Sequence, residues 1–153
     1  MAQTVFEGLD EVRLAVGMEL GTSDWLEITQ ERVNQFADAT GDHQWIHVDV
    51  DRANAESPFG GPIAHGYLTL SLSNALLPEI VEVQGVSMGV NYGVGKVRFP
   101  APVPVGAAVR LRAHVDAVDE VRDGVQLTVD FTVEVRGADK PAVAAQAVYR
   151  YYL

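Results

Sequence analysis

The chain has 153 residues, 48% hydrophobic and 21% charged, and this balance favours one globular domain over residues 1–153. It contains no cysteine, which excludes disulfide bonds, cysteine-ligated metals and a thiol nucleophile and is typical of a reducing cytoplasm. The net charge of −10 disfavours binding to nucleic acid or to an anionic membrane surface. No apolar run reaches about 18 residues and residues 1–20 lack the features of a secretory signal, so we expect a cytoplasmic protein with no membrane segment.

The beginning of the chain is predicted to be a loosely ordered lead-in, over residues 1–28, with short extended pieces. Val12, Leu14 and Val16 alternate with other residues in the period of a β-strand. Residues 21–24 (GTSD) form a cluster that is typical of a turn.

A first helix is predicted over residues 30–39, with an apolar stripe at helical spacing. Thr29 stands where its side chain can cap the first turn, and Gly41 stands where helices commonly end. A further helical turn is expected over residues 51–55. Residues 57–62 (SPFGGP) carry the strongest loop signal in the chain.

A second helix is predicted from Gly66 to Leu77, ended by Pro78. It is apolar on nearly all sides apart from small hydroxyl residues, and a helix of this character is normally buried.

The second half of the chain has the period of β-strands. Long alternating stretches end at turn signals in residues 123–124 and 137–140, so neighbouring strands are expected to pair antiparallel. Helices followed by an antiparallel sheet indicate an α+β domain, in which the sheet covers the buried helix. The predicted strands cover residues 86–90, 96–99, 109–115, 125–135 and 143–151.

Asp42 and His47 form the most informative pair in the sequence. They lie five residues apart just after the first predicted helix, where a loop can bring both side chains to one point. A carboxylate and an imidazole that share one water molecule can remove a proton from it and return a proton elsewhere. Taken alone, the same residues also fit a turn aspartate and a structural histidine.

The start of the second helix is the other candidate for a functional element. Its first N–H groups have no partner inside the helix and lie at the positive end of the helix dipole. Gly66 has no Cβ, so a ligand can approach this end closely, and a thioester carbonyl placed there is stabilised as it becomes an enolate oxyanion. The alternative is that Gly66 is simply a tight helix start.

Together these two segments resemble the MaoC-like dehydratases, which include the (R)-specific enoyl-CoA hydratases and the proteins similar to nodulation protein N. The family pattern is a Gly-Asp pair followed by a histidine and, downstream, a Pro-Ile-x-His-Gly-x-Leu element. The resemblance covers most of residues 25–151. Its segments here are residues 41–47 (GDHQWIH), 62–68 (PIAHGYL), 91–93 (NYG), 96–99 (KVRF) and 100–106 (PAPVPVG).

The resemblance implies a hot-dog fold, in which the sheet wraps the helix that begins at Gly66. It also implies a homodimer that takes acyl-CoA thioesters near the subunit interface, without a cofactor or a metal. By match to the motif, Asp42 and His47 are the catalytic pair and the Gly66 N–H is the oxyanion donor. The implied reaction is the reversible hydration of a trans-2-enoyl-CoA to an (R)-3-hydroxyacyl-CoA.

The chain departs from the commonest sequence pattern of the family, because Gln44 and Trp45 stand where many members have Asn-Pro. This leaves the Asp-His pair intact and is similar to the branch of nodulation protein N. Five further residues are interpreted as substrate-binding, with simple packing or solvent exposure as the alternative. They are His65, Asn74 and Tyr92, and Lys96 and Arg98, whose shared strand face can meet the phosphates of CoA.

Three other functions compete with the hydratase. The first is another hot-dog activity, acyl-CoA thioesterase, since one fold hosts several chemistries. The second is a non-catalytic protein that binds an acyl group or a partner in signalling. The third is a metal site, because His43 and His47 are four residues apart with Asp42, Asp49 and Asp51 nearby. The loop-like composition of this segment argues against that site.

Overall fold

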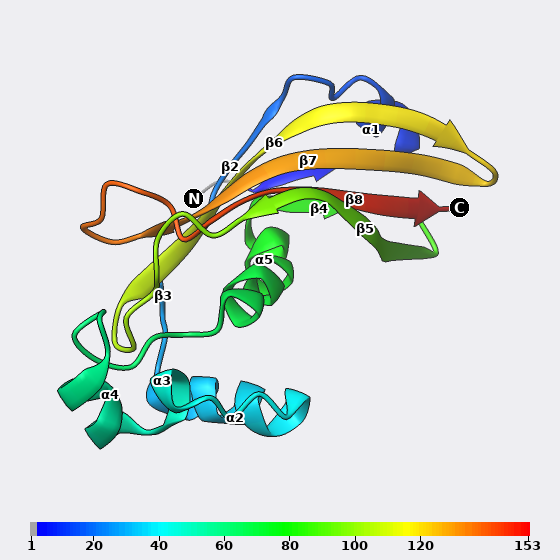
Figure 1. Ribbon diagram of the computed structural model, residues 1–153. Helices are drawn as coiled ribbons and strands as arrows, with labels where there is room; N and C mark the ends of the chain where they lie inside the picture. Colours follow the sequence, from blue (N-terminus) through cyan, green and yellow to red (C-terminus); the bar gives the residue numbers. More distant parts are fainter. Residues whose placement is uncertain (1–2) are drawn as a thin grey trace.

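The computed structural model describes residues 3–153, and its largest element is a curved antiparallel sheet (Figure 1). The strands are hydrogen-bonded in the order β2-β6-β7-β8-β5, and β3 pairs with the first two residues of β6. The long strands β6, β7 and β8 follow one another along the chain and pair in register over most of their lengths. The strands are β2 (Glu19–Thr22), β3 (Leu26–Glu27), β5 (Met88–Arg98), β6 (Ala108–Val121), β7 (Gly124–Val135) and β8 (Val143–Tyr152).

One long helix, α5 (Gly66–Ile80), lies against the concave face of this sheet (Figure 1). Side chains of β7 alternate between buried and half-buried positions, because successive residues of a strand point to opposite faces. The buried face of the sheet and the buried side of α5 belong to one hydrophobic core. The predicted arrangement, a sheet that covers a buried helix, is therefore present. Representative core residues are Leu68, Leu72, Leu76, Ile80, Leu111, Leu127, Val129 and Val133.

Three shorter helices form a further layer on the side of α5 away from the sheet: α2 (Gln30–Thr40), α3 (Trp45–Val48) and α4 (Val50–Glu56) (Figure 1). At the start of the chain, β1 (Thr4–Phe6) pairs parallel with β4 (Val81–Val83), which directly follows α5. Among the described residues no helix has both the length and the apolar character needed to cross a membrane.

The helix α2 confirms the prediction for its segment in detail. The Thr29 side chain accepts a hydrogen bond from the Arg32 N–H and so caps the first turn. Gly41 ends the helix in the left-handed region, with φ of 82°. The further helical turn predicted near residue 51 is also present, as α4.

The predicted extended lead-in is wrong at two places, and its first two residues lie outside the described part. Val12 belongs to a short helix, α1 (Leu9–Arg13), in which Leu9 and Val12 are buried on one side, whereas Leu14 is 85% exposed. Packing of this one helical face against the core overrides the local strand period. The turn predicted at residues 21–24 begins inside β2, which bends at a bulge next to Gly21.

Two further element boundaries differ from the prediction. Pro78 does not end α5, which continues to Ile80. Proline removes a single backbone hydrogen bond here, and the burial of Ile80, which is 1% exposed, keeps the last turn in place. The two short strands predicted over residues 86–90 and 96–99 are parts of one strand, β5, whose pairing with β8 is interrupted by two irregularities.

Candidate active site

The loop after α2 carries Asp42. The Gly41 N–H donates to the Ala37 carbonyl at 2.8 Å, which closes the helix and turns the chain so that the next residue leaves the helix axis. The Asp42 N–H then donates to the Thr40 hydroxyl, and Asp42 Oδ1 accepts from the Gln44 N–H, both at 3.4 Å. The aspartate therefore has the role of a turn residue, while its carboxylate remains exposed.

His47 lies on α3, a helix of one turn where the sequence predicted a loop. Two hydrogen bonds to carbonyls of this turn hold it in place: the Gln30 side chain donates to the His47 carbonyl at 2.8 Å, and the Ile63 N–H donates to the Ile46 carbonyl at 3.0 Å. Consequently His47 is fixed both to α2 and to the segment that leads into α5, and its side chain is buried.

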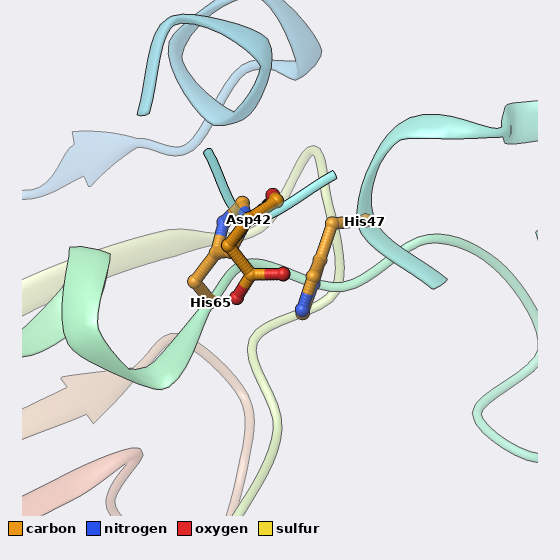
Figure 2. A group of neighbouring side chains, drawn as sticks. All are labelled: Asp42, His47 and His65. Carbon is orange, nitrogen blue, oxygen red and sulfur yellow. Dashed lines mark hydrogen bonds between the residues drawn. The ribbon is translucent and has the colours of Figure 1, made fainter. Parts of the chain in front are cut away.

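Asp42 and His47 converge, and His65 joins them (Figure 2). Each of the three residues offers one oxygen or nitrogen atom, and these atoms all lie within 4.8 Å of one another. His65 directly precedes Gly66, the first residue of α5. The carboxylate and the imidazole thus meet beside the N-terminus of the buried helix, which is the geometry that the sequence motif requires.

The hydrogen bonding of His47 determines which of its nitrogens is free. Nδ1 lies 2.7 Å from the Ile63 carbonyl oxygen, and since a carbonyl can only accept, Nδ1 carries a proton and Nε2 is left for other partners. The pKa of His47 is lowered below 6.5, first by burial, and the nearby His65 acts in the same direction. The hydrogen bond to Ile63 and the charge of Asp42 oppose this shift. At neutral pH, Nε2 can therefore accept a proton.

The same three residues are the group that comes closest to a metal site in the described chain. The rings of His47 and His65, however, are stacked, with centroids 3.8 Å apart and planes inclined by 24°. Because imidazole lone pairs lie in the ring plane, stacked rings direct them side by side, not toward a common ion. His43, which the competing metal hypothesis used, lies outside this group, and its Nε2 pairs with Asp38 at 3.0 Å.

The start of α5 leaves its first N–H groups open, because no side chain of the described residues caps this end. The Phe99 ring lies directly over Gly66, and a Cβ on that residue would come within 3.2 Å of the ring. Gly66 and Phe99 also border a cavity of about 360 Å³ together with Thr69. A side chain at residue 66 would therefore require the Phe99 ring to shift by a few tenths of an ångström.

Two of the predicted substrate-binding residues, Asn74 and Tyr92, line a second cavity of about 260 Å³ beside α5. The Tyr149 hydroxyl donates to Asn74 Oδ1 across this cavity at 3.2 Å. Burial raises the pKa of Tyr149 to about 12, so its hydroxyl keeps its proton and remains a donor. The Arg150 guanidinium lies 3.5 Å from the centroid of the Tyr92 ring.

The other two predicted substrate-binding residues, Lys96 and Arg98, lie at the exposed end of β5. Arg98 Nη1 donates to the neighbouring Val97 carbonyl at 2.9 Å. Arg98 directly precedes Phe99, which covers Gly66.

Three residues of the site were not singled out from the sequence as functional. Phe36 contributes to the apolar stripe of α2, and its ring lies against His65, with centroids 4.8 Å apart. Ile63 acts through its backbone carbonyl, which no side-chain pattern indicates. Phe99 follows the charged residues of β5, and only its contact with Gly66 shows its role.

A curved sheet around one buried helix, with an aspartate and a histidine beside the start of that helix, places the chain among the hot-dog proteins. Residues 11–136 match the family model of the MaoC like domain, and the chain belongs to this family. The resemblance found in the sequence motifs is thereby confirmed.

Individual relatives agree with this assignment. The chain is 53% identical, over 95% of its length and 97% of the relative's, to 3-hydroxyacyl-thioester dehydratase Z of Mycobacterium tuberculosis. It is 46% identical to nodulation protein N of Rhizobium meliloti, over 90% of this chain and 86% of that one. The structure is similar to an (R)-hydratase from A. caviae involved in PHA biosynthesis, with a TM-score of 0.68, 27% identity, and coverage of 87% and 96% of the two chains.

Proposed function

We propose that the protein is a hydratase that reversibly adds water to the C2–C3 double bond of a trans-2-enoyl thioester and gives an (R)-3-hydroxyacyl thioester. The observation that carries the proposal is the convergence of Asp42 and His47 beside the uncapped N-terminus of α5. A 3-hydroxyacyl-thioester dehydratase at 53% identity and an (R)-hydratase of similar structure support the same reaction.

In this proposal the thioester oxygen lies at the Gly66 N–H. Attack of water on C3 moves electrons toward the thioester carbonyl, so negative charge develops on its oxygen. The free N–H groups and the dipole of α5 stabilise that charge because they are already oriented before the reaction begins.

Asp42 and His47 hold the water against C3. His47 Nε2 accepts a proton from the water as its oxygen bonds to C3, because Nδ1 is already committed to the Ile63 carbonyl. The exposed Asp42 carboxylate accepts a hydrogen bond from the other O–H of the water, which stays on the oxygen, and so orients the water. A proton then returns from this pair to C2, so the product contains the atoms of the enoyl thioester and one water molecule.

We propose CoA as the carrier of the acyl group, with Lys96 and Arg98 near its phosphates and with Asn74 and Tyr92 along the acyl chain. Both basic residues are exposed on a chain of net charge −10, so they are local exceptions to its acidic surface. We further propose that residues 1–153 act as one hot-dog domain in the cytoplasm, as the cysteine-free composition led us to expect.

The test is a spectrophotometric hydration assay with crotonyl-CoA and longer enoyl-CoA esters, followed by chiral analysis of the product. Asp42→Asn and His47→Gln should each lower kcat/KM by about 10²- to 10⁴-fold, since each removes one proton-transfer group. His43→Gln is the matched control, because His43 lies in the same loop but pairs with Asp38 outside the site. It should stay within about twofold of wild type.

Three outcomes would contradict the proposal. Near-full turnover by either site variant would remove that residue from the reaction. Release of free CoA thiol without hydration would identify a thioesterase. Binding of enoyl-CoA without turnover by the wild-type protein would identify a non-catalytic acyl-binding protein.

We also propose that two copies of the chain form a homodimer through β5. This strand is at the end of the sheet order, so one of its edges has no partner in the described residues, and nearly all of its side chains are exposed. An exposed apolar edge strand is a template for pairing with another chain. The exposed apolar residues of β5 are Met88, Val90, Tyr92 and Val94.

Sedimentation velocity tests the dimer. Val94→Lys should shift the protein toward monomer, because it places a charge on the proposed interface. Leu14→Lys is the matched control, since Leu14 is also an exposed apolar residue but lies beyond α1. A wild-type monomer, or a dimer that both variants leave unchanged, would refute pairing through β5.

A further inference from the structure

His65 makes a hydrogen bond that holds the backbone of Asp42. Its Nε2 lies 2.9 Å from the Asp42 carbonyl oxygen. A carbonyl oxygen has no hydrogen to give, so Nε2 is the donor. The contact joins residues 23 positions apart, and it fixes the loop at the residue whose carboxylate lies in the proposed site.

The ring of His65 also supports His47. The two imidazoles are stacked at 3.8 Å between centroids, and the Phe36 ring contacts His65 at 4.8 Å with an inclination of 52°. His65 is 3% exposed, so its ring has little freedom to move. It therefore restricts the position of the His47 ring beside it.

The backbone of His65 belongs to the third element of the site. It is the residue before the first turn of α5, and its carbonyl accepts a hydrogen bond from the Thr69 N–H at 3.2 Å. His65 thus contacts Asp42 through its side-chain nitrogen and His47 through its ring face, and it is joined to Gly66 by a peptide bond.

The remaining nitrogen of His65 is not available to a substrate. Nδ1 is buried and has no hydrogen-bond partner among residues 3–153. A buried polar atom without a partner is unfavourable for stability, so its presence calls for a physical reason. An apolar side chain would avoid this cost, but it has no N–H to donate to the Asp42 carbonyl.

We propose that His65 is a positioning residue, which sets Asp42 and His47 relative to the Gly66 N–H and does not bind substrate itself. This inference rests on the proposed hydratase function. It replaces the substrate-binding role that the sequence suggested for His65 with a role exerted through its two neighbours.

Two substitutions separate the hydrogen bond from the stacking. His65→Phe keeps a ring over His47 but removes the donor to Asp42. His65→Gln keeps a donor at the same number of bonds from Cα but removes the ring. A misplacement of reacting groups by about 1 Å costs roughly 10²-fold in rate. His65→Phe should therefore lower kcat for crotonyl-CoA by roughly 10²-fold with KM within about threefold of wild type, and His65→Gln should recover part of this loss.

A double-mutant cycle with Asp42→Asn completes the test. If His65 acts by placing Asp42, His65→Phe should cost much less in the Asp42→Asn background than in the wild type. Additive losses, a raised KM with kcat unchanged, or full activity of His65→Phe would each overturn the positioning role. Failure of both His65 variants to fold, judged by circular dichroism, would also overturn it in favour of a purely structural role.

The same data distinguish the inference from the proposed function. Full hydration by His65→Phe together with an inactive Asp42→Asn would refute only the positioning role. Absence of hydration by the wild-type protein would refute the function itself.

Discussion

The bend at Gly41 offers a direct test of how the loop places Asp42. Gly41 has φ of 82°, a left-handed conformation, and a Cβ added there would meet nothing within 4 Å. Gly41→Ala is therefore a purely conformational change. The left-handed region costs an L-residue about 1–2 kcal/mol, and in a domain of this size each kcal/mol lowers Tm by about 2–4 °C. We expect Tm to fall by roughly 2–8 °C.

Gly137→Ala is the matched control. Gly137 has φ of 79° and equally open surroundings, but it lies between β7 and β8. Both variants should lose similar stability in thermal unfolding followed by circular dichroism. Only Gly41→Ala should also lose activity, by roughly 10²-fold in kcat/KM for crotonyl-CoA at 20 °C, because relief of the strain moves Asp42.

The comparison of the two alanine variants decides whether the reasoning holds. Equal activities at equal loss of Tm would show that the bend at Gly41 does not set the position of Asp42. Gly41→Asn should recover part of both stability and activity, because asparagine tolerates the left-handed conformation better than alanine.

Three further predictions concern pH, stability and acyl-chain preference. Because burial lowers the pKa of His47, kcat/KM should fall only below pH 6.5. The free energy of unfolding should decrease over the same pH range, because the unfolded state binds the proton more readily than the folded state. A fall in kcat/KM centred above pH 6.5 would contradict this. Thr29→Ala removes the cap on the Arg32 N–H and should cost about 1 kcal/mol in urea unfolding, and no loss would show that the cap is dispensable. Tyr149→Phe removes the hydroxyl that donates to Asn74 and should raise, by a few-fold, the ratio of kcat/KM for octenoyl-CoA to kcat/KM for crotonyl-CoA. An unchanged ratio would place the acyl chain elsewhere.

The parts of the fold that the sequence predicted are those in which local signals and tertiary packing agree. The helix from Gln30 carries a capping threonine, an apolar stripe and a terminal glycine, and all three are consistent with burial of one face. Buried and less buried positions alternate most clearly in β7 and in the first half of β6, because one face of the sheet covers α5. In each case the spacing of apolar residues in the sequence and the face that is buried in the fold indicate the same helix or strand.

The failures occur where packing overrides a local signal. Val12 is fully buried on a helix although its neighbours alternate as in a strand. Pro78 remains inside α5 because Ile80, two residues later, is in the core. In β5, glycines at 93 and 95 and a broken register divide the sequence pattern, although the chain continues as one strand.

In the candidate site, the sequence could give the chemistry of the residues but not their backbone contacts. The motif predicted Asp42, His47 and Gly66 as site residues, from the resemblance to the family pattern. The contacts that orient them run through the carbonyls of Ile63 and Asp42, and every residue has a carbonyl. Only a folded chain shows which carbonyls face a histidine.

These two carbonyl contacts give the two histidines different roles in the proposed site. Each imidazole donates one N–H to a backbone carbonyl from a different segment, so each ring has one nitrogen committed to the fold. In His47 the other nitrogen is left for proton transfer, whereas in His65 the other nitrogen is buried. The stacked rings place His47, whose free nitrogen exchanges the proton in the proposed reaction, directly against His65. An exchange of roles between them would require both carbonyl contacts to break, which fixes His47 as the member that takes part in the proposed reaction.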